Sequence, residues 1–175
     1  GTEITFKGSE RLFERPLDIY QKICIDNKFK FKKNANSLTV CGNLQSQNFE
    51  IDGSISSQFI TGLIFALVHL KSECEIKIIP PFESRSYINL TIEALNRFGA
   101  KIEFSDELTI KIHKSDLHAF SGKVEGDYSN AAFLDGFNYL GSDIRIHNLN
   151  PDSLQGDKIY IDYFKQIQNG TPTLD

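Results

Sequence analysis

The sequence predicts an α/β (α+β) protein built from βαβαββ repeats, and three observations support this fold class. The chain repeats its own pattern at an offset of 73 residues, which separates Ser56 from Ser129 (129 − 56 = 73) and Tyr87 from Tyr160 (160 − 87 = 73). Helix-type and strand-type hydrophobic periodicity alternate within the interval. Hydrophobic residues make up 40% of the chain and charged residues 24%, which is ordinary for a globular protein with a sizeable core.

One complete repeat is predicted over about 46–122. Apolar residues at helical spacing predict a first helix over about 56–70, and a second helix is expected over 87–98. Gly99 supplies the left-handed residue that ends the second helix. Strands are expected at 49–51, 75–78, 101–104 and 108–113.

Partial repeats flank the complete one. The strand patterns at 4–7 and 29–31 recur 72 and 73 residues later (76 − 4 = 72, 102 − 29 = 73). Residues 129–170 repeat the first half of the unit, with a strand expected at 143–146. The chain is therefore expected to be an internal fragment, with an incomplete version of the fold.

Domain organisation follows from the repeats. Residues 1–122 are expected to form part of one domain and 123–175 to begin a second, truncated one, with the boundary in the polar segment 122–127. The full-length parent is expected to be a monomer, whereas self-association of the fragment is left open.

Composition limits the class of partner. The net charge of −4 argues against nucleic-acid binding, and no apolar run approaches the ~18 residues that span a bilayer. Three cysteines and four histidines lack metal-type spacing, so no metal is expected. A cytoplasmic protein with small-molecule partners is the expectation.

The most informative segment is 52–59, Asp-Gly-Ser-Ile-Ser-Ser-Gln-Phe, at the start of the first helix. A helix N-terminus carries partial positive charge and unpaired N–H donors, so it binds anions. Ser56 and Ser57 are placed to donate to phosphate oxygens, and Gln58 to reach a second acceptor. The alternative is plain capping of the helix, for which Ser54 or Ser56 is sufficient.

Two further segments are candidates for the same ligand. Ser84 and Tyr87 precede and begin the second helix, and both helices are expected to start on the same side of the sheet because the strands before them run in the same direction. Tyr87 is alternatively a half-buried aromatic at a helix start. Arg11 lies in the equivalent loop of the preceding partial repeat, where arginine suits a carboxylate or phosphate.

These segments, in this order and spacing, resemble the EPSP synthase family (3-phosphoshikimate 1-carboxyvinyltransferases). The segments that carry the resemblance are 11–16 (Arg-x-x-x-Arg-Pro), 52–63 (with Ser-Ser-Gln), 84–88 (Ser-x-x-Tyr-Ile), 124–129 (after which the family's chain crosses between its two domains) and 154–157 (a later loop). Ser86 stands where the family often has a proline.

The resemblance implies an enolpyruvyl transferase-like fold of six βαβαββ repeats in two domains. It implies transfer of the enolpyruvyl group of phosphoenolpyruvate to the 5-hydroxyl of shikimate 3-phosphate, with release of phosphate, in the shikimate pathway of chorismate and aromatic amino-acid biosynthesis. No metal or organic cofactor takes part. The implied ligands of shikimate 3-phosphate are Ser56, Ser57, Gln58, Ser84 and Tyr87, and those of phosphoenolpyruvate are Arg11 and Gln58.

The resemblance assigns no catalytic residue within this chain, because the family's acid–base residues have no counterpart in it. The chain alone is therefore expected to be inactive. Two alternatives are kept: a relative of UDP-N-acetylglucosamine enolpyruvyl transferase, and a non-catalytic anion-binding module built from the same repeat.

Overall fold

The structure is a computed structural model that describes residues 1–83 and 85–170. The chain divides into two compact units, Gly1–Gln47 and Asn48–Asp175. Each unit has its own sheet and is described by itself.

The first unit is a three-stranded antiparallel sheet with strand order β1-β3-β2. Its elements are β1 (Ile4–Lys7), α1 (Glu10–Phe13), α2 (Asp18–Asp26), β2 (Lys30–Asn34) and β3 (Ser37–Cys41). The strands expected near 4–7 and 29–31 are therefore present. Because β2 and β3 form a hairpin and β1 pairs with β3, the unit has the strand pairing of the later part of a βαβαββ repeat.

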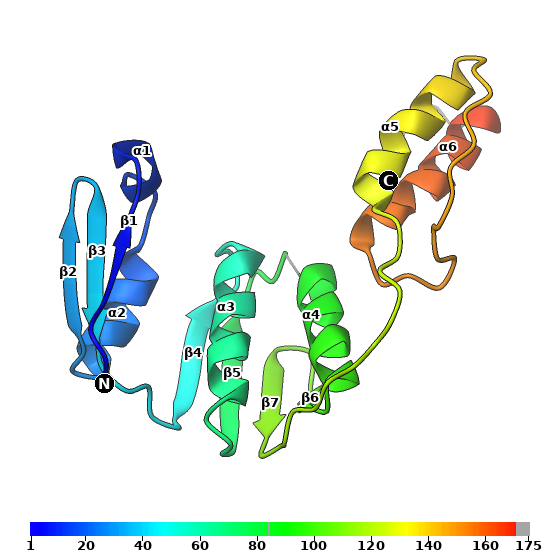
Figure 1. Cartoon of the computed structure of the whole chain (residues 1–175). Helices are drawn as coiled ribbons and strands as arrows, with labels where there is room; N and C mark the ends of the chain where they lie inside the picture. Colours follow the sequence, from blue (N-terminus) through cyan, green and yellow to red (C-terminus); the bar gives the residue numbers. More distant parts are fainter. Residues whose placement is uncertain (84, 171–175) are drawn as a thin grey trace. The chain divides into compact units, whose positions relative to one another are not determined.

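The second unit opens with the complete repeat that the sequence predicts. Its elements are β4 (Asn48–Asp52), α3 (Ser57–Val68), β5 (Cys74–Ile79), α4 (Arg85–Arg97), β6 (Lys101–Phe104) and β7 (Thr109–His113). The strand order is β4-β5-β7-β6, in which β4 and β5 are parallel and the other pairs antiparallel (Figure 1). The βαβαββ prediction is thus confirmed.

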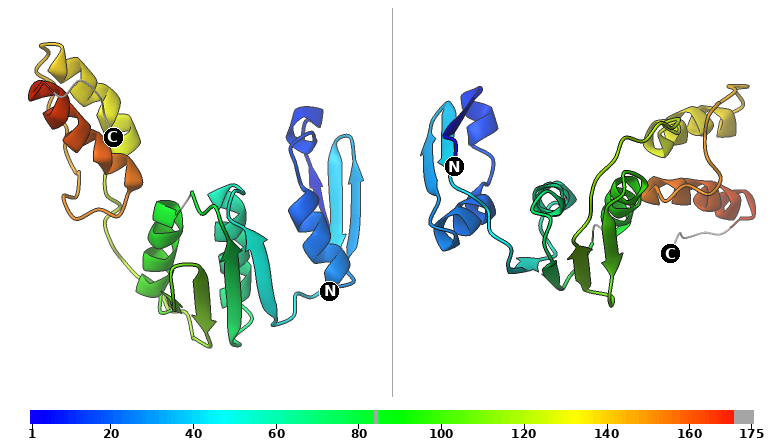
Figure 2. Two further views of the ribbon diagram at one scale, coloured as in Figure 1. Left: turned by 180° about the vertical axis from the view of Figure 1, so that it is seen from behind. Right: turned by 60° about the horizontal axis from the view of Figure 1, so that its bottom comes forward.

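The core of this repeat lies between the sheet and its two helices. Figure 2 shows α3 and α4 on one face of the sheet. The largest fully buried side chains are Ile60, Ile64, Leu67, Ile76, Ile78, Ile88, Ile110 and Ile112. On β5, Ile76 and Ile78 alternate with more exposed charged residues, which gives the sheet one apolar and one polar face. This burial fixes the helices on the apolar face.

After β7, the regular elements described up to residue 170 are helices joined by irregular segments. They are α5 (Tyr128–Tyr139), the 3₁₀-helix η1 (Gly156–Ile159) and α6 (Tyr160–Gln168). Tyr128, Ala131 and Tyr160 form a small buried cluster between α5 and α6. The helix expected to begin near Tyr160 is therefore present.

The strand expected at 143–146 is absent from the described structure, so that prediction is wrong. The Asn138 side chain takes both main-chain groups of Ile144: its Nδ2 donates to the Ile144 carbonyl (2.9 Å) and its Oδ1 accepts from the Ile144 N–H (2.7 Å). A strand also needs a neighbouring strand, and none is found in the described part of 114–170. The domain boundary near 122 stays a prediction.

Candidate ligand-binding site

The start of α3 holds three of the predicted site residues. Ser56 is the N-cap, and its Oγ accepts a hydrogen bond from the Gln58 N–H at 3.3 Å, so the capping function expected from the sequence is confirmed. Ser57, the first helical residue, is half-buried, and the Gln58 side chain is exposed. Accepting one bond leaves the Ser56 O–H able to donate. Capping and ligand binding are therefore compatible at this helix start.

The loop before α3 is ordered by a carboxylate. Asp52 Oδ1 accepts hydrogen bonds from the Ser54 hydroxyl (2.6 Å) and the Ser54 N–H (2.9 Å). The hydroxyl bond, followed by the N–H bond, lowers the pKa of the Asp52 carboxyl. Because Ser54 donates its hydroxyl to Asp52, the donors that this segment offers to a ligand are those of 56–58.

Gly53 allows the loop after β4 to lie against the loop after β5. Its N–H donates to the Ile79 carbonyl at 2.7 Å. A Cβ at this position would lie 2.4 Å from the Pro81 carbonyl oxygen and 2.6 Å from Ile78 Cγ2, so only glycine fits. The sequence reasoning missed this role, although a glycine directly after a strand is a signal for such a close approach.

The parallel pairing of β4 with β5 places the starts of α3 and α4 at the same edge of the sheet, as expected. The two helices are also joined by a hydrogen bond of 2.9 Å between the hydroxyls of Thr61 and Thr91. The structure therefore brings the helix start that carries 56–58 and the helix start that carries Tyr87 to one edge.

Tyr87 lies in the first turn of α4 and is 49% exposed, which agrees with the alternative of a half-buried aromatic at a helix start. Its hydroxyl donates to Asp157 Oδ2 at 3.1 Å. This hydrogen bond, with the charge of Asp157, raises the pKa of the Tyr87 phenol. Asp157 belongs to η1 and was not among the predicted site residues.

Two predicted site residues are not part of the described second unit. Ser84 lies outside the described residues. Arg11 lies in α1 of the first unit with an exposed side chain. The Arg11 and Ser84 assignments therefore stay predictions.

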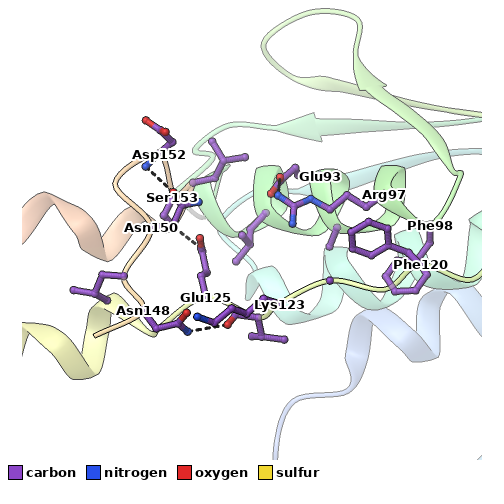
Figure 3. A pocket seen from close by; sticks show the side chains of 16 residues that line it. Glu93, Arg97, Phe98, Phe120, Lys123, Glu125, Asn148, Asn150, Asp152 and Ser153 are labelled. Carbon is purple, nitrogen blue, oxygen red and sulfur yellow. Dashed lines mark hydrogen bonds and ion pairs between the residues drawn. The ribbon is translucent and has the colours of Figure 1, made fainter. Parts of the chain in front are cut away.

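An open hollow of about 900 Å³ lies between α4 and the segments 120–125 and 148–154 (Figure 3). Its lining has both charge signs, with Arg97 and Lys123 beside Glu93, Glu125 and Asp152. Among the described residues, none of the predicted site residues lines it. With acidic side chains so prominent, this hollow is a poor anion site, and the helix starts remain the candidate.

Within 1–83 and 85–170 the chain has neither a metal-type cluster nor a membrane-spanning helix. No cluster of three or more histidine, cysteine, aspartate or glutamate side chains in those ranges could hold a metal ion. No helix in the same ranges has the length and apolar character needed to cross a membrane.

Together, fold and site define a class of protein: one built from βαβαββ units in which consecutive helix starts meet at one sheet edge. A family model described as EPSP synthase (3-phosphoshikimate 1-carboxyvinyltransferase) matches residues 1–171. The chain belongs to the EPSP synthase family.

Similar proteins agree with this membership. The 3-phosphoshikimate 1-carboxyvinyltransferase of Clostridium novyi (strain NT) is 39% identical over 169 residues, which cover 94% of this chain and 39% of that protein. The protein of the same name from Clostridium beijerinckii is 41% identical over 169 residues, covering 93% and 38%. The chain thus spans well under half the length of these curated relatives.

A solved structure shows the same fold. The EPSP synthase from Acinetobacter baumannii superposes with a TM-score of 0.57 at 19% identity, over 75% of this chain and 29% of that one.

Proposed function

We propose that this chain is part of an enzyme that transfers the enolpyruvyl group of phosphoenolpyruvate to the 5-hydroxyl of shikimate 3-phosphate. In that reaction the hydroxyl oxygen adds to C2 of phosphoenolpyruvate while the methylene carbon gains a proton. The tetrahedral intermediate then loses a proton from the resulting methyl group together with phosphate, which restores the double bond. Membership of the EPSP synthase family supports this function over that of the related UDP-N-acetylglucosamine enolpyruvyl transferase and over a non-catalytic anion-binding module. The cytoplasmic location and the absence of cofactors stay predictions.

One observation carries the proposal: the parallel β4–β5 pair sets two helix N-termini at one edge, and the sequence places the donors of 56–58 at the first and the Tyr87 hydroxyl at the second. In this proposal Ser56 and Ser57 donate to the phosphate of shikimate 3-phosphate, helped by the partial positive charge of the α3 start. Gln58 contacts both substrates and Tyr87 lies beside the shikimate. Preorganised donors around anionic substrates are the source of such catalysis.

Two further assignments complete the proposed site. Ser84 contributes a hydroxyl to the shikimate 3-phosphate subsite. Arg11 contacts the carboxylate or phosphate of phosphoenolpyruvate, for which a planar guanidinium is suited.

The test is a titration of the ¹⁵N-labelled chain with shikimate 3-phosphate, followed by amide chemical shifts. We expect shifts concentrated at 56–58 and at Tyr87. Ser57→Ala should weaken binding by about tenfold, because it removes a donor to a charged acceptor. Ser54→Ala is the matched control. Because the Ser54 hydroxyl already donates to Asp52, this substitution should leave the affinity unchanged.

Two results would contradict the proposed site. One is an absence of focused shifts at millimolar ligand. The other is an equal loss of affinity in Ser54→Ala and Ser57→Ala, which would mean that the loop, and not the Ser57 hydroxyl, is what matters.

A further inference from the structure

Asp157 occupies a place that the proposed function does not explain. Its Oδ2 accepts two hydrogen bonds, from the Tyr87 hydroxyl at 3.1 Å and from the Ser129 hydroxyl at 2.8 Å. Tyr87 lies in the first turn of α4 and Ser129 in the first turn of α5. A single carboxylate oxygen therefore joins the starts of two helices.

The loop that carries Asp157 is itself held by hydrogen bonds. Gln155 Nε2 donates to Glu125 Oε1 (2.8 Å) and to the Gly126 carbonyl (2.9 Å), while its Oε1 accepts from the Tyr128 N–H (2.9 Å). Glu125 also accepts from the Ser153 hydroxyl. Figure 3 shows Glu125 directed toward this loop. Because the loop is tied to segment 125–128, Asp157 meets Tyr87 from a fixed position.

The repeat gives an independent reason to single out Asp157. It lies one offset after Ser84 (157 − 84 = 73), just as Ser129 lies one offset after Ser56. The later repeat therefore has a carboxylate where the complete repeat has a serine, and this carboxylate bonds the serine at its own helix start. In the later repeat, the anion at the helix start is therefore a carboxylate of the chain itself, that of Asp157.

This carboxylate decides what Tyr87 can offer to a ligand. An ionised carboxylate only accepts hydrogen bonds, so Tyr87 is the donor in its bond with Asp157. A phenol has one hydrogen, which leaves only oxygen lone pairs for a ligand. Asp157 also raises the pKa of the Tyr87 phenol and so keeps it protonated. The negative charge repels a phosphate group that approaches Tyr87.

We propose that Asp157 is a positioning residue that makes Tyr87 a hydrogen-bond acceptor, so that Tyr87 recognises a hydroxyl group of the ligand and not its phosphate. This inference rests on the proposed function, because it assumes that a phosphorylated polyol binds at this sheet edge. The site then has a phosphate end at Ser56 and Ser57 and a hydroxyl end at Tyr87 and Asp157.

The first measurement needs no ligand. The chain is labelled with ¹³C at tyrosine Cζ, and the pKa of Tyr87 is followed by NMR in the wild type and in Asp157→Asn. We expect a lower Tyr87 pKa in the variant, because the charge that favours the protonated phenol is gone. An unchanged pKa would show that the contact does not form, and would overturn the inference whatever binds.

The second measurement compares shikimate 3-phosphate with inorganic phosphate as probes. The quantity compared is the affinity for shikimate 3-phosphate divided by the affinity for inorganic phosphate. In Asp157→Asn this ratio should fall about fivefold, since Tyr87 can now donate to an anion. Tyr87→Phe should lower the same ratio by weakening shikimate 3-phosphate alone. In the double variant, Asp157→Asn should change the ratio less than it does alone, because only the effect of its charge remains once the Tyr87 hydroxyl is gone.

Asp152→Asn is the matched control, because it removes the same charge from the same loop region without touching a residue bonded to Tyr87. If Asp157→Asn and Asp152→Asn change both affinities equally, only net charge matters and the inference is wrong while the proposed function stands. If shikimate 3-phosphate produces no shifts at 56–58 in the wild type, the proposed function fails, and hydroxyl recognition fails with it. The ligand-free titration distinguishes this case from loss of the Tyr87–Asp157 contact.

Discussion

At the scale of single residues, Gly99 shows how backbone conformation and space act together. It ends α4 with a φ of +90°, a conformation that side chains with a Cβ rarely adopt. A Cβ would also lie 2.5 Å from His118 Cδ2 and 2.9 Å from the Asp116 carbonyl oxygen. Gly141 has a similar φ of +103° with nothing within 4 Å of its Cβ position. Both positions therefore have a backbone conformation that is strained for a residue with a Cβ, but only Gly99 also lacks the space for one.

We expect Gly141→Ala to lower the free energy of unfolding by about 1 kcal/mol, the cost of a left-handed alanine. Gly99→Ala should cost a further 1–3 kcal/mol or so, because backbone atoms of 116 must move as well. Urea unfolding with an unchanged m-value measures both changes. Equal losses in the two variants would mean that the contacts around Gly99 do not contribute.

Whether the sequence predicted a contact of a site residue depended largely on how far away in the sequence its partner lies. The sequence predicted a serine cap for α3, at Ser54 or Ser56, because a cap depends only on the following turn, and the structure shows that Ser56 provides it. It did not predict that Asp52 takes the Ser54 hydroxyl, although that partner is two residues away. Nothing in the local pattern indicated that Asp157 would meet Tyr87, since the two lie 70 residues apart and only the tertiary fold brings them together.

At the scale of secondary-structure elements, helices were predicted more securely than the strand at 143–146. Helix α3 depends on its own periodicity and cap, and it lies where the sequence placed it. A strand depends on a partner for its main-chain groups, and the same alternating pattern that forms β5 beside β4 forms no strand at 143–146. There the Asn138 side chain bonds the main chain of Ile144 instead.

His113 contacts two carboxylates, one on β6 and one directly before β5. At the end of β7, its Nδ1 lies 2.8 Å from Glu73 Oε2 and its Nε2 lies 3.4 Å from Glu103 Oε1. Glu103 belongs to β6, and Glu73 directly precedes β5. The hydrogen bond to Glu73, followed by that to Glu103, raises the pKa of His113 above its ordinary 6.5.

This geometry predicts a pH dependence of stability. Because the pKa of His113 is higher in the folded state, its contribution is fully present below the unfolded pKa of 6.5 and is lost as pH rises through the folded pKa. Urea midpoints between about pH 5.5 and about pH 8.5 should fall in the wild type and change less in His113→Gln. A parallel pH profile in the two proteins would show that the exposed His113 pairs contribute nothing measurable.

At the scale of the whole molecule, we expect the chain to bind the proposed substrate shikimate 3-phosphate without catalysing the reaction. The described edge of the second unit offers donors for one phosphorylated substrate, whereas Arg11 lies in the other unit. The chain spans 39% of the length of its Clostridium novyi relative. The sequence-based prediction is that none of the family's acid–base residues lies in it. Donors that hold a ground-state phosphate do not by themselves supply the proton transfers of enolpyruvyl exchange.

We therefore expect the 175-residue chain to bind shikimate 3-phosphate and yet to release no phosphate when phosphoenolpyruvate is added. A continuous phosphate-release assay should give the rate of the protein-free buffer. Ser57→Ala, assayed in parallel, identifies the source of any signal, because a contaminating enzyme would not respond to this substitution. Steady release that Ser57→Ala diminishes would show that the residues on these two units are enough for chemistry, and the missing acid–base groups would then have to be sought among the exposed carboxylates of this chain.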